Sequence, residues 1–111
     1  MTATPPSEVE ALGALREQFS DASLKSSTRV LILISLALNR KMSFVSLMSL
    51  TGQGKGSLTN HLEKLEESNF ITTRTKATFR GTRTVVEITD KGLGAYNSLL
   101  HTLNAFQEKG Y

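Results

Sequence analysis

The residues best suited to binding chemistry lie at the start of segment 51–70, which has the sequence TGQGKGSLTNHLEKLEESNF. One cation and three short polar side chains occur close together there: Lys55, Ser57, Thr59 and Asn60. They surround Gly56, although glycine costs a helix about 1 kcal/mol relative to alanine. Leu58, Leu62 and Leu65 follow at i, i+4, i+7 spacing, which lines one face of a helix. We interpret the segment as a helix whose first turns closely approach another surface.

The sequence predicts neither catalysis nor metal binding. Segment 52–57 (GQGKGS) superficially resembles a phosphate-binding loop, but it lacks the GxxxxGK[ST] spacing and follows an expected helix instead of a strand. No nucleophile, base and orienting group are paired by any pattern. The chain has two histidines, His61 and His101, and no cysteine. We therefore expect no enzyme, no cofactor and no metal, and interpret His61, beside the leucines, as a partly buried structural residue.

Positive charge is concentrated in the middle of the chain. Residues 29–86 contain nine cations and three anions, whereas both flanks are slightly acidic. Within residues 68–86 there are four cations and no acid: Arg74, Lys76, Arg80 and Arg83. This distribution indicates an anionic partner for the middle of the chain.

A chain of 111 residues fits a single domain. We expect a flexible leader over 1–7, one domain over 8–107 and a tail over 108–111. Ser7 to Glu10 forms a capping-box pattern for a helix ending near residue 19. A second helix is predicted over about 28–39. Its 30/33/34/37/38 spacing favours a buried helix, although its β-branched residues would also suit a strand. This apolar run is too short to span a membrane.

The remaining pattern predicts a winged helix-turn-helix. Ser43 can cap a short helix over 44–50, and a glycine-containing turn leads into the leucine-lined helix, so the helix-turn-helix covers about 43–68. Two β-rich segments, 70–75 and 84–88, predict strands joined by a hairpin tip over 76–83, with Gly81 at the turn. Together they form a basic wing over about 70–88. Thr89 caps a last helix over about 90–107. The predicted fold class is mainly α with a small β-hairpin (α+β), with extra N- and C-terminal helices.

Two motifs resemble known regulators. Residues 54–67 (GKGSLTNHLEKLEE) resemble the recognition helix of winged-helix regulators of the MarR and ArsR kind, and residues 88–92 (ITDKG) resemble the opening of their C-terminal helix. The resemblance covers roughly residues 26–103, and Gly54 departs from the usual Ser or Thr cap. It implies a cytoplasmic, homodimeric transcriptional regulator that binds double-stranded DNA sequence-specifically. The recognition helix would enter the major groove, and the wing would touch the backbone or minor groove.

The resemblance and the charge pattern together give the expected DNA contacts: Lys55, Gly56, Ser57, Thr59, Asn60, Arg74, Lys76, Arg80 and Arg83. Asn60 is the candidate for reading bases, since asparagine can bond adenine bidentately, and the alternative is a merely exposed polar residue. The alternative for the hairpin cations is solubilising charge.

The terminal helices are expected to form the dimer. The last helix has apolar residues on more than one stripe, and the first helix is its natural partner, unless that helix packs on its own domain. The expected interface comprises Val9, Leu12, Phe19, Tyr96, Leu99, Leu103 and Phe106. The alternative function is a winged-helix protein–protein interaction module that does not read DNA. The sequence identifies no small-molecule effector.

Overall fold

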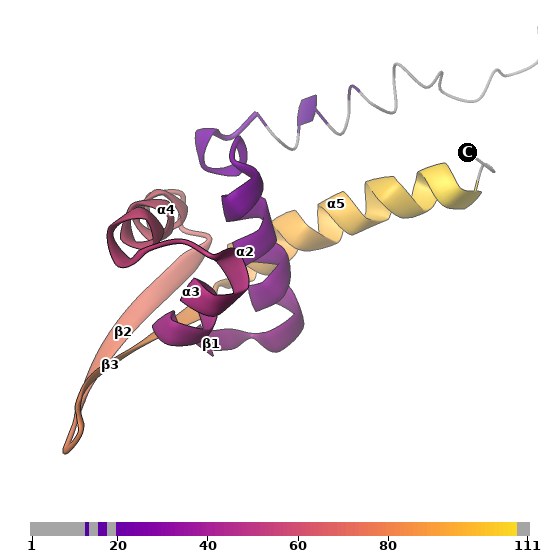
Figure 1. Ribbon diagram of the computed structural model, residues 1–111. Helices are drawn as coiled ribbons and strands as arrows, with labels where there is room; N and C mark the ends of the chain where they lie inside the picture. Colours follow the sequence, from indigo (N-terminus) through magenta and orange to yellow (C-terminus); the bar gives the residue numbers. More distant parts are fainter. Residues whose placement is uncertain (1–12, 14–15, 18–19, 109–111) are drawn as a thin grey trace, which may run out of the picture.

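The computed structural model describes residues 13, 16–17 and 20–108 (Figure 1). The elements follow in the order η1 (Ala22–Leu24), α2 (Ser27–Asn39), β1 (Lys41–Ser43), α3 (Phe44–Thr51), α4 (Lys55–Glu67), β2 (Ile71–Thr78), β3 (Gly81–Ile88) and α5 (Asp90–Glu108). The strands form an antiparallel sheet in the order β1-β3-β2. The β2–β3 hairpin projects away from the helices, and α5 extends in the other direction (Figure 1). The predicted fold class, mainly α with a winged helix-turn-helix, is confirmed.

Local capping explains where several helices begin and end. Ser26 accepts a bond from the Arg29 amide at 3.4 Å, and Ser43 accepts one from the Ser46 amide at 3.1 Å. Gly52, in the left-handed conformation at φ 68°, ends α3. Gly54 is the N-cap of α4 and supplies no side-chain bond there. The capping box predicted at Ser7 lies outside the described residues, as does most of the helix predicted over 8–19.

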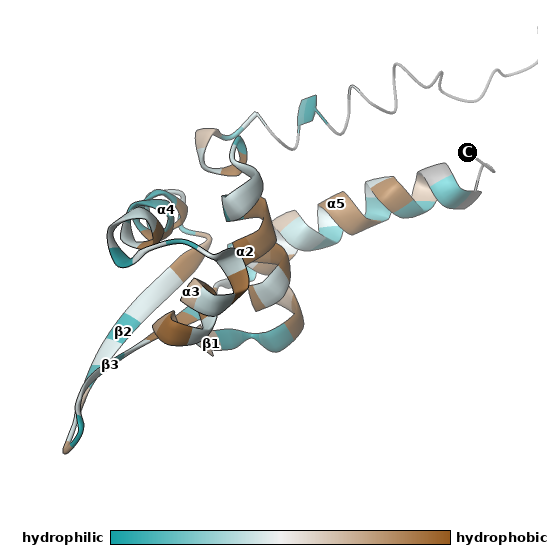
Figure 2. Cartoon of the chain, in the orientation of Figure 1, coloured by the Kyte–Doolittle hydropathy of each residue, from teal (hydrophilic) through white to brown (hydrophobic). Residues whose placement is uncertain are grey.

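The core forms where α2, α3, α4 and the sheet meet. The three leucines predicted on α4 are buried, and they lie with other buried apolar residues: Ile32, Leu33, Leu36, Leu47 and Val86. Figure 2 shows hydrophobic colour concentrated on α2 and α3, whereas most of α4 and the hairpin is neutral or hydrophilic. Leu58, Leu62 and Leu65 form the leucine seam of α4. This seam holds α4 against the core, while the polar residues of the helix stay outside.

The buried face predicted for α2 is partly wrong. Leu33 is buried as expected, but Leu38 is 69% exposed, and the buried set includes Ile32 and Leu36. The helix is apolar on nearly every side, so periodicity could not determine its orientation in the core. Leu31 and Leu38, spaced i and i+7, share an exposed face.

Two features of the sheet differ from the prediction. Strand β1 was not predicted; its Met42 pairs with Val86 of β3. The hairpin strands also run further, to Thr78 and from Gly81, so the loop contains only Phe79 and Arg80. Cross-strand pairing stabilises both extensions, and the pairing partner is not visible in the local pattern.

Among the glycines that the structure describes, Gly92 has the least room for a side chain. Thr89 caps α5 as predicted, accepting a bond from the Gly92 amide at 3.0 Å and donating to the Asn69 carbonyl at 2.6 Å. This brings the start of α5 against the end of α4. A Cβ at Gly92 would overlap the Phe70 carbonyl oxygen and lie 2.7 Å from Ile88 Cγ1.

We therefore expect Gly92→Ala to lower the free energy of unfolding by about 1–3 kcal/mol, because backbone must move to admit the methyl group. Gly94→Ala is the matched control. No atom lies within 4 Å of a Cβ at Gly94 in α5, so alanine should stabilise the helix by up to about 1 kcal/mol. Urea unfolding measures both variants. Equal stability of the two would contradict the close approach at Gly92.

Candidate nucleic-acid interface

The exposed side of α4 carries all five residues predicted to contact DNA from this helix. They are Lys55, Gly56, Ser57, Thr59 and Asn60. The leucine seam lies on the opposite side, so burying the leucines turns these residues outward. Packing of α4 thus leaves an uninterrupted polar surface on its first two turns.

The polar side chains of this surface differ in their hydrogen bonds. Thr59 Oγ1 donates to the Lys55 carbonyl at 2.8 Å, and Ser57 Oγ donates to Gln53 Oε1 at 2.5 Å. The Asn60 carboxamide has no hydrogen-bond partner among the residues that the structure describes. Its donors and its acceptor are all available to a ligand.

Packing within the chain does not require glycine at Gly54 or Gly56, at the start of α4. A Cβ on Gly54 or Gly56 would have no atom within 4 Å, and neither residue has a positive φ. Gly56 therefore lowers the helix propensity of α4 without any steric gain within the described chain. Close approach of an external surface would explain why this position has no side chain.

The register of the hairpin separates its side chains into two faces. Lys76 lies opposite Arg83 and Thr75 opposite Thr84, and directly paired residues share a face. Arg74, Lys76 and Arg83 therefore start from one face. Thr73, Thr75 and Thr84 start from the other, where Thr73 Oγ1 donates to the Glu66 carboxylate of α4 at 3.2 Å. Arg80 lies in the loop.

An open hollow of about 770 Å³ separates the hairpin tip from α3 and α4. Three cations predicted at different places in the sequence line it together, Lys55, Arg80 and Arg83, and no acid does. Hydroxyl groups complete its polar lining: Ser43, Ser46, Thr78, Thr82 and Thr84. Arg74 and Lys76 are exposed on the hairpin but do not line the hollow. The sequence reasoning gave Ser43 only a capping role and missed Ser46.

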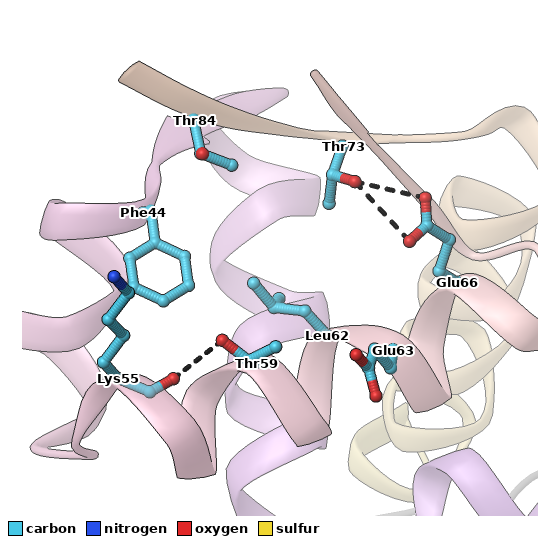
Figure 3. Close-up of a pocket in the computed structure, with 8 residues that line it drawn as sticks. All are labelled: Phe44, Lys55, Thr59, Leu62, Glu63, Glu66, Thr73 and Thr84. Atoms are coloured by element: carbon cyan, nitrogen blue, oxygen red, sulfur yellow. Dashed lines mark hydrogen bonds between the residues drawn. The ribbon is translucent and has the colours of Figure 1, made fainter. Parts of the chain in front are cut away.

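A smaller hollow of about 300 Å³ lies between α4 and the base of the hairpin (Figure 3). Figure 3 shows Lys55 beside the Phe44 ring at one end, and Glu63 and Glu66 at the other. Positive charge thus lies at the start of α4 and negative charge in its second half.

Arg29 connects the middle of α4 to η1. Its Nη1 lies 3.0 Å from Nδ1 of His61, and its Nε donates to the Ser23 carbonyl at 2.6 Å. Because a guanidinium can only donate, His61 Nδ1 accepts, and the ring is neutral with its proton on Nε2. Burial lowers the pKa of His61, and the charge of Arg29 lowers it further. His61 is thus a structural residue, as expected.

The end of α4 is held by a second network. Asp21 accepts bonds from the Ser23 hydroxyl at 2.7 Å, the Ser23 amide at 2.9 Å and the Ser68 hydroxyl at 3.0 Å. These hydrogen bonds, those from Ser23 first, hold the pKa of Asp21 below its ordinary value. Lys91 Nζ donates to the Ser68 carbonyl at 2.8 Å. The two networks fix the position of α4 against η1 and α5.

Lowering the pH below the ordinary His61 pKa of 6.5 should destabilise the protein. The folded pKa lies below the unfolded one, so the unfolded chain binds more protons in this range. The stability is fully present above the unfolded pKa and is lost as the pH falls through the folded pKa. Urea unfolding at about pH 7.5 and about pH 5.5 measures the loss, which His61→Gln should reduce.

The predicted dimer residues are only partly described. Tyr96 and Leu99 are half-buried on α5, and Leu103 is 46% exposed. Val9, Leu12, Phe19 and the side chain of Phe106 lie outside the described part of the chain. Among the residues that are described, further exposed leucines occur on α2 and α5: Leu31, Leu38 and Leu100. The unexpected orientation of α2 explains why the sequence reasoning missed two of them.

Within the described residues, no helix has both the length and the apolar character needed to span a membrane. No group of three His, Cys, Asp or Glu side chains there is arranged to hold a metal ion.

Comparisons with known proteins agree on one architecture. The model of the winged helix DNA-binding domain family matches residues 28–107. A transcriptional regulator homologue from Pyrococcus horikoshii OT3 is 30% identical, with a TM-score of 0.74 over 87% of this chain and 96% of that chain. Transcriptional regulator Tm0710 from Thermotoga maritima is 23% identical, with a TM-score of 0.68 over 91% of this chain and 66% of that one. Reduced AbfR bound to DNA is 19% identical, with a TM-score of 0.63 over 85% of this chain and 68% of that chain. The latter two show the fold alone, and no curated protein matches.

Proposed function

The chain belongs to the winged helix DNA-binding domain family, and from this premise we propose that it binds double-stranded DNA sequence-specifically as a homodimeric, MarR/ArsR-like transcriptional regulator. The observation that carries the proposal is the acid-free hollow in which Lys55, Arg80 and Arg83 come together beside the polar start of α4. A phosphate backbone matches this lining in charge and in hydrogen-bonding groups. Such a regulator acts in the cytoplasm and needs no catalytic group or cofactor.

In the proposed complex, the first two turns of α4 enter the major groove. Asn60, which points away from the leucine seam and is unbonded among the described residues, is the candidate for reading a base edge. Gly56 lets the helix backbone approach the groove. Lys55, Arg80 and Arg83 bind the phosphates of the strand that runs through the hollow.

Binding to duplex DNA at increasing salt tests the function directly. Sequences selected from random duplexes should bind tightly at low salt and lose affinity steeply as salt rises, because each neutralised phosphate releases counterions. Wild-type protein that bound no duplex, or bound it without salt dependence, would favour the protein-interaction module instead.

Dimerisation is proposed on the exposed leucines of α2 and α5, whose exposure in a single subunit favours burial by a second copy. Leu100→Glu combined with Leu103→Glu should give a folded monomer, since both side chains are exposed in the subunit. Sedimentation at micromolar concentration measures the change. Leu50→Glu on α3 is the control and should remain dimeric. A monomeric wild type under the same conditions would refute the proposal.

A further inference from the structure

The side chain of Phe79 is 98% exposed, whereas the other exposed large apolar side chains of the described chain range from 40% to 71%. It occupies the first position of the two-residue loop at the tip of the hairpin. A fully exposed phenylalanine forgoes the benefit of burying its ring. Its position at the furthest point of the hairpin makes an external ligand the natural source of that burial.

The loop that carries the ring is well supported. Thr78 Oγ1 donates to the Gly81 carbonyl at 2.6 Å and accepts from the Arg80 amide at 3.3 Å. Gly81 closes the turn with φ 115°, and strand pairing continues up to Thr78 and Gly81. The ring is thus held out on an ordered tip, which reduces the entropy cost of binding.

The surroundings of the ring indicate which ligand it fits. The Arg80 guanidinium carbon lies 5.8 Å from the ring centroid, and the nearest charged residues along the strands, Lys76 and Arg83, are also cations. An apolar ring flanked only by positive charge suits a narrow apolar space between two rows of phosphates. The minor groove of duplex DNA has this composition, and proteins that bind it often insert apolar wedges between base steps.

The position of the hollow between α4 and the hairpin tip agrees with a minor-groove site for Phe79. A sugar-phosphate strand separates the major groove from the adjacent minor groove. If such a strand occupies the hollow of about 770 Å³ between the hairpin tip and α4, the helix and the tip lie on its two sides. Phe79 itself lines the hollow at the hairpin tip. With α4 in the major groove, its ring then lies against this strand, on the side of the neighbouring minor groove.

We propose that Phe79 is an apolar wedge that enters the minor groove beside each half-site and partly unstacks one base step. The proposal rests on the DNA-binding function above. The wedge contributes specificity through deformability, because pyrimidine–purine steps such as TA and CA/TG open most easily. Arg80, next to the ring, holds a flanking phosphate.

The test uses the full chain and a duplex selected from a random library by the wild-type protein, with 2-aminopurine placed in turn at each step flanking the half-sites. Wild-type protein should increase the fluorescence at one step and bend the DNA, as measured by the mobility of circularly permuted fragments. Phe79→Ala should weaken binding about tenfold and abolish both signals. The log–log salt slope should stay unchanged, since no charge is lost. Phe79→Leu should retain part of the signals, and Leu50→Ala, which truncates an exposed side chain on α3, should retain them fully.

Three results would overturn the wedge. Phe79→Ala could bind with wild-type affinity and fluorescence; it could flatten the salt slope, which would mean that the ring only positions Arg80; or the wild type could leave every flanking step stacked. The proposed function would survive all three. Its own failure is distinct, because wild-type protein would then show no salt-dependent binding to any duplex.

Discussion

Replacing both Arg80 and Arg83 by alanine is expected to flatten the salt dependence of DNA binding by nearly half. If each subunit makes about four phosphate contacts, a dimer makes about eight, and the log–log slope is near −7. The double variant removes about four of these contacts, so the slope should become about −4. Affinity at low salt should fall for all sequences alike, because phosphate contacts carry no base information.

The hairpin supplies a matched control for this experiment. Arg74→Ala combined with Lys76→Ala removes the same charge from the same hairpin, but neither residue lines the hollow. This variant should change the slope clearly less. Equal changes would mean that the hairpin acts through its overall charge. An unchanged slope in the Arg80 and Arg83 variant would place the hollow away from DNA and favour the protein-interaction alternative.

Asn60→Ala is expected to remove specificity more than affinity. Its carboxamide, which has no partner in the part of the chain that the structure describes, can form a bidentate pair with adenine. The loss should cost about 1–3 kcal/mol per half-site on the preferred sequence. Binding to unrelated duplex should hardly change. Selection from random duplexes should also show a relaxed preference at one position in each half-site.

Asn97 on α5 provides the control, since Asn97→Ala makes the same chemical change at an exposed position remote from α4. It should leave both affinities unaltered. A loss of specific and nonspecific affinity by the same factor in Asn60→Ala would identify Asn60 as a backbone contact or a structural residue, and base reading would have to be assigned elsewhere.

Features with a local cause could be predicted from the sequence. Ser43 and Thr89 cap helices because a hydroxyl reaches an amide only a few residues ahead. Three leucines placed α4 against the core, and the same periodicity turned Lys55 and Asn60 outward. The hairpin was also expected, because β-branched residues flank a glycine turn. Each of these signals is contained within a few neighbouring residues.

Other features depended on segments far apart in the sequence and were decided only by the tertiary structure. Strand β1 exists because residues 41–43 pair with residues 85–87, and three residues carry no periodic signal of their own. The orientation of α2 followed from its neighbours, since a helix that is apolar on nearly every side gives no preferred face. The candidate site also combines a feature with a local cause and a feature that depends on long-range packing. Local periodicity exposed Lys55, but the arrangement of Lys55, Arg80 and Arg83 around one hollow required the sheet to place the hairpin next to α3 and α4. Cation types are visible in a sequence, whereas the distance between them is set by long-range packing.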